Sequence, residues 1–250
     1  TTIRFSQSEL KRPPPENFLS DSPTTIHEPK TEVIQPQDGW VTLLPCVDTV
    51  RDLPPGPVGG GHWRKLENGL RSPVQQFARI RVPLALPLQS EYQIRAQFAR
   101  LSGSDSVNFY LPVGSRQVLL VIDGFGGKGL SGLQAVKNRN DPIPGETGVG
   151  NFHLDNGVRY TVDATVKIRE NQASIHVRLG GQGSFQFEWT GPIGDLSLID
   201  SRFTLDDTRV LGLGAWESEV QFYELTFRTL RQNAQWTRPP WVEVTPPEGQ

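Results

Sequence analysis

Two glutamates near the C-terminal end of the chain, Glu217 and Glu219, are the first candidates for catalytic chemistry. They are two positions apart, so on a strand both carboxylates would point to the same side. Hydrolysis of a glycosidic bond needs two carboxyl groups roughly 5 to 10 Å apart. The pair follows Gly214-Ala215-Trp216, however, which is typical of a turn before a strand. We therefore interpret both glutamates as solvated turn charges and assign no catalytic residue.

Aromatic residues in or beside expected loops, together with three polar residues, form a second kind of candidate site. Aromatic rings cover the apolar face of a pyranose, while amides and carboxylates bind its hydroxyl groups. The candidate ligand-binding residues are Trp63, Asn108, Asp123, Phe125, Trp216 and Glu217. The three aromatic residues would form a platform, and the other three would supply hydrogen bonds. The alternative is that these rings pack in the core or at its rim, as we expect for Trp40 and Trp189.

Other reactive residues do not form a familiar site. The four histidines are scattered without the spacing of zinc ligands. The stretch Gly126-Gly127-Lys128-Gly129 lacks both the spacing and the following helix of a phosphate-binding loop. Cys46 is the single cysteine, and its apolar neighbours indicate a buried structural thiol. We therefore predict no cofactor from these residues, and the metal ligands stay unknown.

The composition limits the classes of partner. A formal net charge of −2 gives no field that favours nucleic acid, so no nucleic-acid partner is expected. No apolar run approaches the roughly 20 residues that a membrane helix needs, so no transmembrane segment is expected in this chain. The sequence contains no methionine, and we expect it to be a piece of a longer product.

Alternation of apolar and polar residues dominates the middle of the chain and predicts strands with one buried face. The clearest segments are 92–98, 107–113, 160–168, 173–179 and 185–189. The run 118–122 is apolar at every position and should be an inner strand covered on both faces. Turn signals such as Asn156-Gly157 separate these segments, whereas 124–150 is expected to be a long loop. Roughly eleven or twelve strands without a convincing helix predict an all-β, two-sheet antiparallel sandwich of the jelly-roll type.

The ends of the chain differ from this middle part. Residues 1–37 are rich in proline and have no periodicity, so we predict an extended arm or linker. Residues 38–231 form the predicted sandwich domain. The tail at 232–250 carries prolines together with Trp236 and Trp241. These tryptophans would either pack onto the sandwich or contact another chain or domain.

Three segments together resemble a known family. They are DGWVTLL at 38–44, LPVGSRQVLLVIDG at 111–124, and VLGLGAW at 210–216 followed by VQFY at 220–223. Together they resemble the concanavalin A-like, or laminin G-like, jelly-roll domains abundant in planctomycete bacteria. The closing segment is also similar to the 3-keto-disaccharide hydrolase domain family. The resemblance spans about 38–230 and is more specific for fold than for activity.

The resemblance implies a non-catalytic recognition module on an extracytoplasmic bacterial protein, either periplasmic or at the cell surface. Its ligand would be a glycan or a protein. Two alternatives stay open: a glycoside-processing enzyme of the 3-keto-disaccharide hydrolase kind, and a structural or assembly subunit tied to its neighbours through the tails. Laminin G-like domains often hold one calcium ion at the rim of the sandwich. The aspartates that would contribute to such a calcium site are Asp105, Asp123, Asp141 and Asp155.

Overall fold

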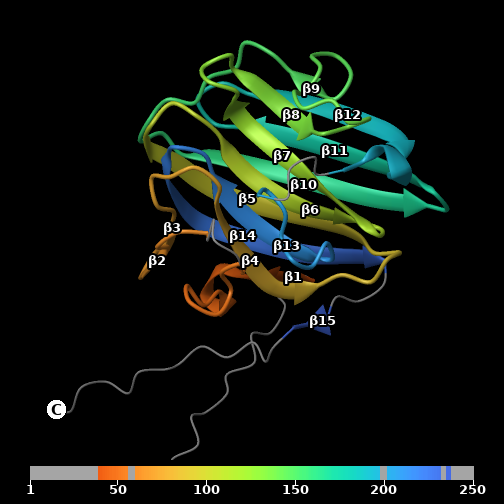
Figure 1. The fold of residues 1–250 in the computed structure, drawn as a ribbon, viewed down its shortest axis with the longest axis horizontal. Coiled ribbons are helices and arrows are strands. Elements are labelled where there is room, and N and C mark those ends of the chain that lie inside the picture. The colour runs from red at the N-terminus through yellow and green to blue at the C-terminus, as the bar shows by residue number, and fades with distance from the viewer. Residues whose placement is uncertain (1–38, 56–59, 198–201, 232–234, 238–250) are drawn as a thin grey trace, which may run out of the picture. The chain divides into compact units, whose positions relative to one another are not determined.

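The computed structural model describes residues 39–55, 60–197, 202–231 and 235–237. The predicted arm at 1–37 and Trp241 in the tail lie outside these residues. Two antiparallel sheets make up the described part of the chain (Figure 1). Its helical segments are two short 3-10 turns, η1 (Leu44–Cys46) and η2 (Ile193–Asp195). The predicted all-β, two-sheet sandwich is therefore confirmed.

The first sheet, called sheet A, has eight strands. Their spatial order is β12 (Phe185–Pro192), β11 (Gln172–Gly180), β10 (Tyr160–Arg169), β5 (Glu91–Ser102), β14 (Glu219–Arg231), β3 (Gly69–Arg71) and β2 (Arg64–Leu66), with β1 (Trp40–Thr42) also paired to β14.

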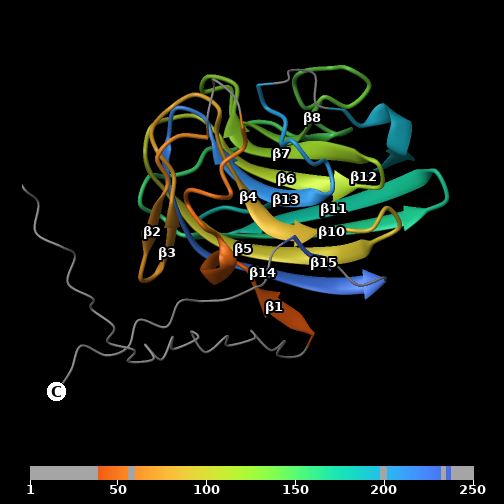
Figure 2. The same cartoon turned by 60° about the horizontal axis from the view of Figure 1, so that its bottom comes forward.

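The second sheet, called sheet B, has seven strands and lies over sheet A (Figure 2). Their spatial order is β15 (Gln235–Trp236), β4 (Ala78–Ala85), β13 (Val210–Ala215), β6 (Val107–Val113), β7 (Arg116–Gly124), β8 (Leu130–Gln134) and β9 (Gly148–Val149).

The core lies between the two sheets and follows the alternation of the sequence. In β5, Tyr92 and Phe98 are fully buried, whereas Arg95 between them faces solvent. Phe98 meets Phe109 of sheet B with ring centroids 5.8 Å apart. Burial of each such side chain stabilises the fold by roughly 1.5–3 kcal/mol. The period of two therefore assigned the inner and outer faces of these strands correctly.

The apolar run in β7 is covered on both faces, as the sequence predicts. Val118, Leu120 and Ile122 belong to the core between the sheets. Leu119 and Val121 belong to a second apolar cluster, together with Leu205 from the segment that precedes β13. Part of the outer face of sheet B is therefore apolar.

Two local features differ from the sequence-based expectations. The segment 124–150 is not a continuous loop, because it contains β8 and β9. Trp40 is partly buried rather than in the core, and the guanidinium carbons of Arg95 and Arg228 lie 5.7 and 4.7 Å from its ring centroid. Beyond residue 231, the backbone of β15 pairs with β4 and extends sheet B. Trp189, in contrast, belongs to the core as expected.

Helices of the described segments are all too short or too polar to span a membrane.

Candidate functional site

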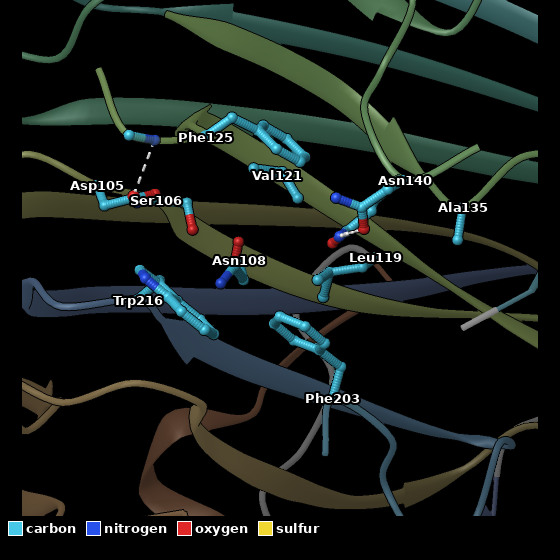
Figure 3. Close-up of a pocket in the computed structure, with 12 residues that line it drawn as sticks. Asp105, Ser106, Asn108, Leu119, Val121, Phe125, Ala135, Asn140, Phe203 and Trp216 are labelled. Atoms are coloured by element: carbon cyan, nitrogen blue, oxygen red, sulfur yellow. Dashed lines mark hydrogen bonds between the residues drawn. The ribbon is translucent and has the colours of Figure 1, made fainter. Parts of the chain in front are cut away.

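A cavity of about 510 Å³ lies on the outer face of sheet B (Figure 3). Its floor includes Asn108 of β6 and Leu119 and Val121 of β7. Phe125 lies on one side, and Trp216 with Phe203 lies on the other. Ligand pockets in proteins are typically about 300–1,000 Å³, mostly apolar with a few polar groups. The cavity has both properties.

The floor of the pocket contains an amide oxygen without a partner. Asn108 points outward because its neighbours in β6, Val107 and Phe109, point into the core. Its side chain is 3% exposed, and Oδ1 accepts no hydrogen bond from the described residues. Leaving a buried acceptor unsatisfied costs roughly 1–3 kcal/mol. The Asn108 oxygen is therefore an unsatisfied acceptor beneath the surface of the pocket floor.

The neighbouring strands approach Asn108 closely on both sides. Asn108 is paired with Val121 on one side and with Gly214 of β13 on the other. A Cβ atom at Gly214 would lie 3.4 Å from the Asn108 Cβ and 2.8 Å from the Ala78 carbonyl oxygen. Because Gly214 has no Cβ atom, the surface beside the Asn108 side chain carries no side chain from β13 at this position.

Stacked aromatic rings form one side of the pocket. Phe203 and Trp216 stack with centroids 5.4 Å apart and an interplanar angle of 25°. Phe77 meets both rings edge-on, at 4.7 Å from Phe203 and 4.5 Å from Trp216. Offset-stacked and edge-to-face arrangements are the preferred ones for aromatic pairs. The three rings support each other and give the pocket a rigid apolar side.

The opposite side depends on a strained turn at the end of β7. Asp123 and Phe125 both have positive φ angles, 53° and 68°, which side chains other than glycine rarely adopt. Such conformations cost about 1–3 kcal/mol each and concentrate at ligand sites. This turn carries the Phe125 ring into the pocket lining.

Asp105 holds this turn against the rest of the site. Its Oδ1 accepts a hydrogen bond from the Ser106 N–H at 2.7 Å, and its Oδ2 accepts one from the Gly126 N–H at 3.0 Å. Burial raises the pKa of the carboxyl, the backbone hydrogen bonds oppose that rise, and the charge of Glu217 adds to it. The net result is a pKa above the ordinary aspartate value.

This raised pKa predicts a pH-dependent stability. The folded chain binds the Asp105 proton more tightly than the unfolded chain does. The resulting stabilisation is present below the unfolded pKa and is lost as the pH rises through the folded pKa. Denaturation between about pH 3 and pH 7 should therefore show the wild type losing stability relative to Asp105→Asn as the pH rises above about 4. Parallel pH profiles for the two proteins would contradict this assignment.

The structure brings together three of the six predicted ligand-binding residues: Asn108, Phe125 and Trp216 line one pocket. Glu217 lies next to it in the turn before β14, with φ of 47°, and accepts a hydrogen bond from Gln76 Nε2. Glu219 forms an ion pair with Arg64 at 2.7 Å. Glu217 is an exposed turn residue, as predicted, whereas the interpretation of Glu219 as a solvated turn charge is wrong, because Glu219 is the first residue of β14 and is partly buried in its ion pair.

Trp63 does not reach the site. Its side chain is 4% exposed, its ring stacks on Phe222 at 6.0 Å, and its indole N–H donates to the Gly60 carbonyl. The predicted role of Trp63 in a ligand platform is corrected to core packing, because no face of the ring is open to a ligand.

Asp123 also has a structural place. It is 1% exposed, and its Oδ2 accepts hydrogen bonds from Arg100 Nη1 at 2.8 Å and from the Leu154 N–H at 2.8 Å. Its Oδ1 lies 3.1 Å from Nδ1 of His153. The predicted hydrogen bonding to a ligand is therefore corrected: both oxygens of Asp123 already have protein partners.

The four aspartates considered for calcium do not converge. Asp123 pairs with Arg100, Asp141 lies 3.4 Å from Lys128 Nζ, and Asp105 accepts backbone N–H groups. Among the residues that the structure describes, no group of three or more His, Cys, Asp or Glu side chains is placed to hold a metal ion.

Sequence reasoning missed Phe203, Gln134 and Asn140 in the pocket lining. Gln134 Nε2 donates to Asn140 Oδ1 at 2.8 Å, which ties the end of β8 to the following turn. Residues 130–134 read Leu-Ser-Gly-Leu-Gln and do not alternate, so the sequence does not place Gln134 on one face of a strand. Phe203 lies in a segment without periodicity, so no signal in the sequence points to it.

Arg81 of β4 anchors the segment that carries Phe203. Its Nη1 donates to both carboxylate oxygens of Asp206, at 2.9 and 2.7 Å, and its Nη2 donates to the Arg51 carbonyl at 2.8 Å. Arg81→Ala should therefore lower the free energy of unfolding by about 1–3 kcal/mol, since paired groups are left without a partner. Chemical denaturation measures this change.

Arg209→Ala is the matched control for Arg81→Ala. Arg209 pairs with Asp207 in the same segment but is exposed to solvent. Exposed ion pairs contribute little to stability. Equal effects of the two substitutions would show that Arg81 does not anchor the segment.

Comparisons with known proteins give a distant likeness. Neither a protein-family model nor a curated protein sequence matches the chain. Among solved structures, winged bean acidic lectin complexed with methyl-alpha-D-galactose is similar at 11% identity and a TM-score of 0.45, over 78% of this chain and 99% of the lectin. Lectin UEA-II complexed with galactose is similar at 10% identity and a TM-score of 0.47, over 80% and 96%.

GH43B of the Bacteroides ovatus xyloglucan PUL is similar at 13% identity and a TM-score of 0.45. The match covers 79% of this chain but 38% of GH43B. With TM-scores below 0.5, these likenesses do not show what the chain binds. The resemblance to planctomycete domains and to the 3-keto-disaccharide hydrolase family stays a prediction.

Proposed function

We propose that the protein is a non-catalytic recognition module that binds a glycan in the pocket on the outer face of sheet B. The observation that carries this proposal is one cavity that combines aromatic rings on two sides with polar side chains in its lining, among them Gln134 and Asn140. The apolar face of a sugar ring packs on aromatic rings, while its hydroxyl groups hydrogen-bond to buried polar groups. Both requirements are met by residues of one cavity.

Hydrolysis receives less support from the same residues. Asp105 is the carboxyl group of the lining, and each of its oxygens accepts a backbone N–H. Hydrolysis of a glycosidic bond needs a second carboxyl group across the bond, and the described lining of the cavity has no other carboxyl group. We therefore assign Asp105 a structural role, in which it accepts the backbone N–H groups of Ser106 and Gly126, and no role in proton transfer.

Binding to a broad glycan array tests the proposal. The wild-type chain should bind at least one glycan saturably, and free glycan of the same structure should compete. A folded wild-type chain that binds no glycan on the array would overturn the proposed function.

A further inference from the structure

We infer that the pocket on the outer face of sheet B selects amino sugars, whose protonated amine lies between the aromatic rings and the carboxylate of Asp105. This inference rests on the proposed function and names the class of glycan that the same site takes. It depends on three observations: the charge of the lining, the exposure of the Asp105 carboxylate, and the rings beside that carboxylate.

Among the described residues, the pocket lining carries one acidic side chain and no basic one. The acidic side chain is that of Asp105. Burial raises the pKa of its carboxyl, and the negative charge of the nearby Glu217 raises that pKa further. A positive charge close to a carboxyl favours its ionised form. A ligand cation would therefore offset the repulsion between the two carboxylates, whereas a neutral ligand would not.

The basic side chains around the pocket are engaged by other groups. Lys128 Nζ lies 3.4 Å from Asp141 Oδ2, and the guanidinium group of Arg202 packs over an aromatic ring at 4.9 Å. Arg100 donates to the backbone carbonyl of Asp105, but its charge is compensated by its own buried ion pair. Within the described part of the chain, no basic side chain forms an ion pair with the Asp105 carboxylate. The place of a counter-charge is therefore open to the ligand.

The carboxylate of Asp105 is accessible to a ligand. Asp105 is partly exposed, and the hydrogen bond that its Oδ2 accepts from the Gly126 N–H lies at the surface. A carboxylate has about four acceptor positions. The backbone N–H groups of Ser106, Phe125 and Gly126 occupy some of them. The acceptor positions that are left can receive hydrogen bonds from an ammonium group.

Two aromatic rings lie close to this carboxylate (Figure 3). Phe125 and Trp216 both line the cavity and are partly exposed. The Trp216 N–H donates to the carbonyl of Ser106, the residue after Asp105, at 3.0 Å, and Phe125 precedes the N–H that Oδ2 accepts. An ammonium group within about 6 Å of a ring centroid is attracted by the face of the ring, most strongly by that of tryptophan. The rings and the carboxylate therefore favour a cation over a neutral group of similar size.

The test is a titration calorimetry series with oligosaccharides of equal length and linkage that are built from glucosamine, N-acetylglucosamine or glucose. They differ in one substituent of each ring, which is an amine, an amide or a hydroxyl. At about pH 6 an amine is protonated and an ordinary carboxyl is ionised. Under these conditions the glucosamine oligomer should bind about fivefold or more tightly than the other two. This preference should shrink in about 0.5 M salt, because salt screens exposed charges.

Three variants separate local charge from total charge. Asp105→Asn should abolish the preference for glucosamine, and Glu217→Gln should reduce it to about twofold or less. Glu188→Gln is the matched control, since it changes the net charge by the same amount on the outer face of sheet A. Glu188 is exposed and accepts a hydrogen bond from Ser174, as Glu217 does from Gln76. The Glu188→Gln variant should keep the wild-type preference.

Equal or tighter binding of the N-acetylglucosamine or glucose oligomer would overturn the inference and leave the proposed function standing. An unchanged preference in Asp105→Asn, or an equal loss of preference in Glu188→Gln, would do the same. If circular dichroism shows that Asp105→Asn does not fold, an unchanged preference in Glu217→Gln is the outcome that overturns the inference. Failure of the glucosamine oligomer to bind, while another glycan binds, also overturns only the inference. Absence of binding by every glycan would overturn both.

Discussion

Asp123→Ala should lower the free energy of unfolding by about 3–5 kcal/mol, because it leaves the Arg100 guanidinium buried without its counter-charge. The side chains of Arg100 and Asp123 are 6% and 1% exposed, and Nη1 lies 2.8 Å from Oδ2. Asp123 also accepts the Leu154 N–H, so the substitution removes a second buried hydrogen bond. Urea denaturation of the purified variant measures the loss.

Asp163→Ala provides the matched control for this prediction. Asp163 also pairs with arginines, at 2.7 Å from Arg95 and 3.2 Å from Arg178, but its side chain is 25% exposed and both arginines are largely exposed. Ion pairs of this kind contribute about 0–1 kcal/mol. If the two aspartate substitutions cost the same, the Arg100–Asp123 pair is not the buried anchor described above.

Trp216→Ala should weaken glycan binding at least tenfold, which corresponds to about 1.4 kcal/mol or more of binding free energy. The substitution removes the ring that stacks on Phe203 at 5.4 Å and lines the pocket. It removes the apolar contact to the sugar and also leaves Phe203 without its stacking partner. Isothermal titration calorimetry with a glycan that binds the wild type on the array measures the change in affinity.

Trp40→Ala is the matched control for Trp216→Ala. It tests whether weaker binding results from a change in the pocket or from the loss of any tryptophan. Trp40 is also partly buried, but it packs on Arg95 and Arg228 of sheet A rather than in the pocket. Its replacement should leave the dissociation constant within about twofold of the wild type. A stronger effect from Trp40→Ala than from Trp216→Ala would move the binding site to the other face of the sandwich.

The sequence predicts the sandwich well because the relevant information is local. Alternation in β5 and β10 depends on residues two positions apart, and the pleat of a strand converts that spacing into an inner and an outer face. The same rule placed Asn108 on the outer face, since its neighbours in β6 are apolar. It also correctly predicted that 118–122 is buried on both faces.

The site is predicted less completely because it depends on contacts between distant residues. Trp63 stands near glycines and prolines that indicate a loop, yet it stacks on Phe222 of sheet A. Asp123 ends a strand, as a ligand-binding residue often does, but its partner is Arg100 of a different sheet. Neither partner can be identified without the pairing of strands far apart in the chain.

Phe203 is a pocket residue that the sequence does not indicate, and its position also depends on contacts with distant residues. It enters the pocket because Arg79 donates to the Thr204 carbonyl and Arg81 pairs with Asp206, and these hydrogen bonds draw the segment onto sheet B. The two arginines alternate with apolar residues in β4 and therefore resemble ordinary surface charges in the sequence. Their role depends on a segment more than one hundred positions away.

The most direct test of glycan binding in this pocket is a two-dimensional ¹⁵N–¹H NMR titration with the tightest-binding oligosaccharide from the array. Binding in this pocket should give saturable shifts of the Asn108 side-chain amide and of the Trp216 indole N–H, together with backbone shifts at Phe125 and Gly126. The indole of Trp40 should stay unchanged. Shifts that centre on Trp40 and the outer face of sheet A, with Asn108 and Trp216 unaffected, would contradict glycan binding in this pocket.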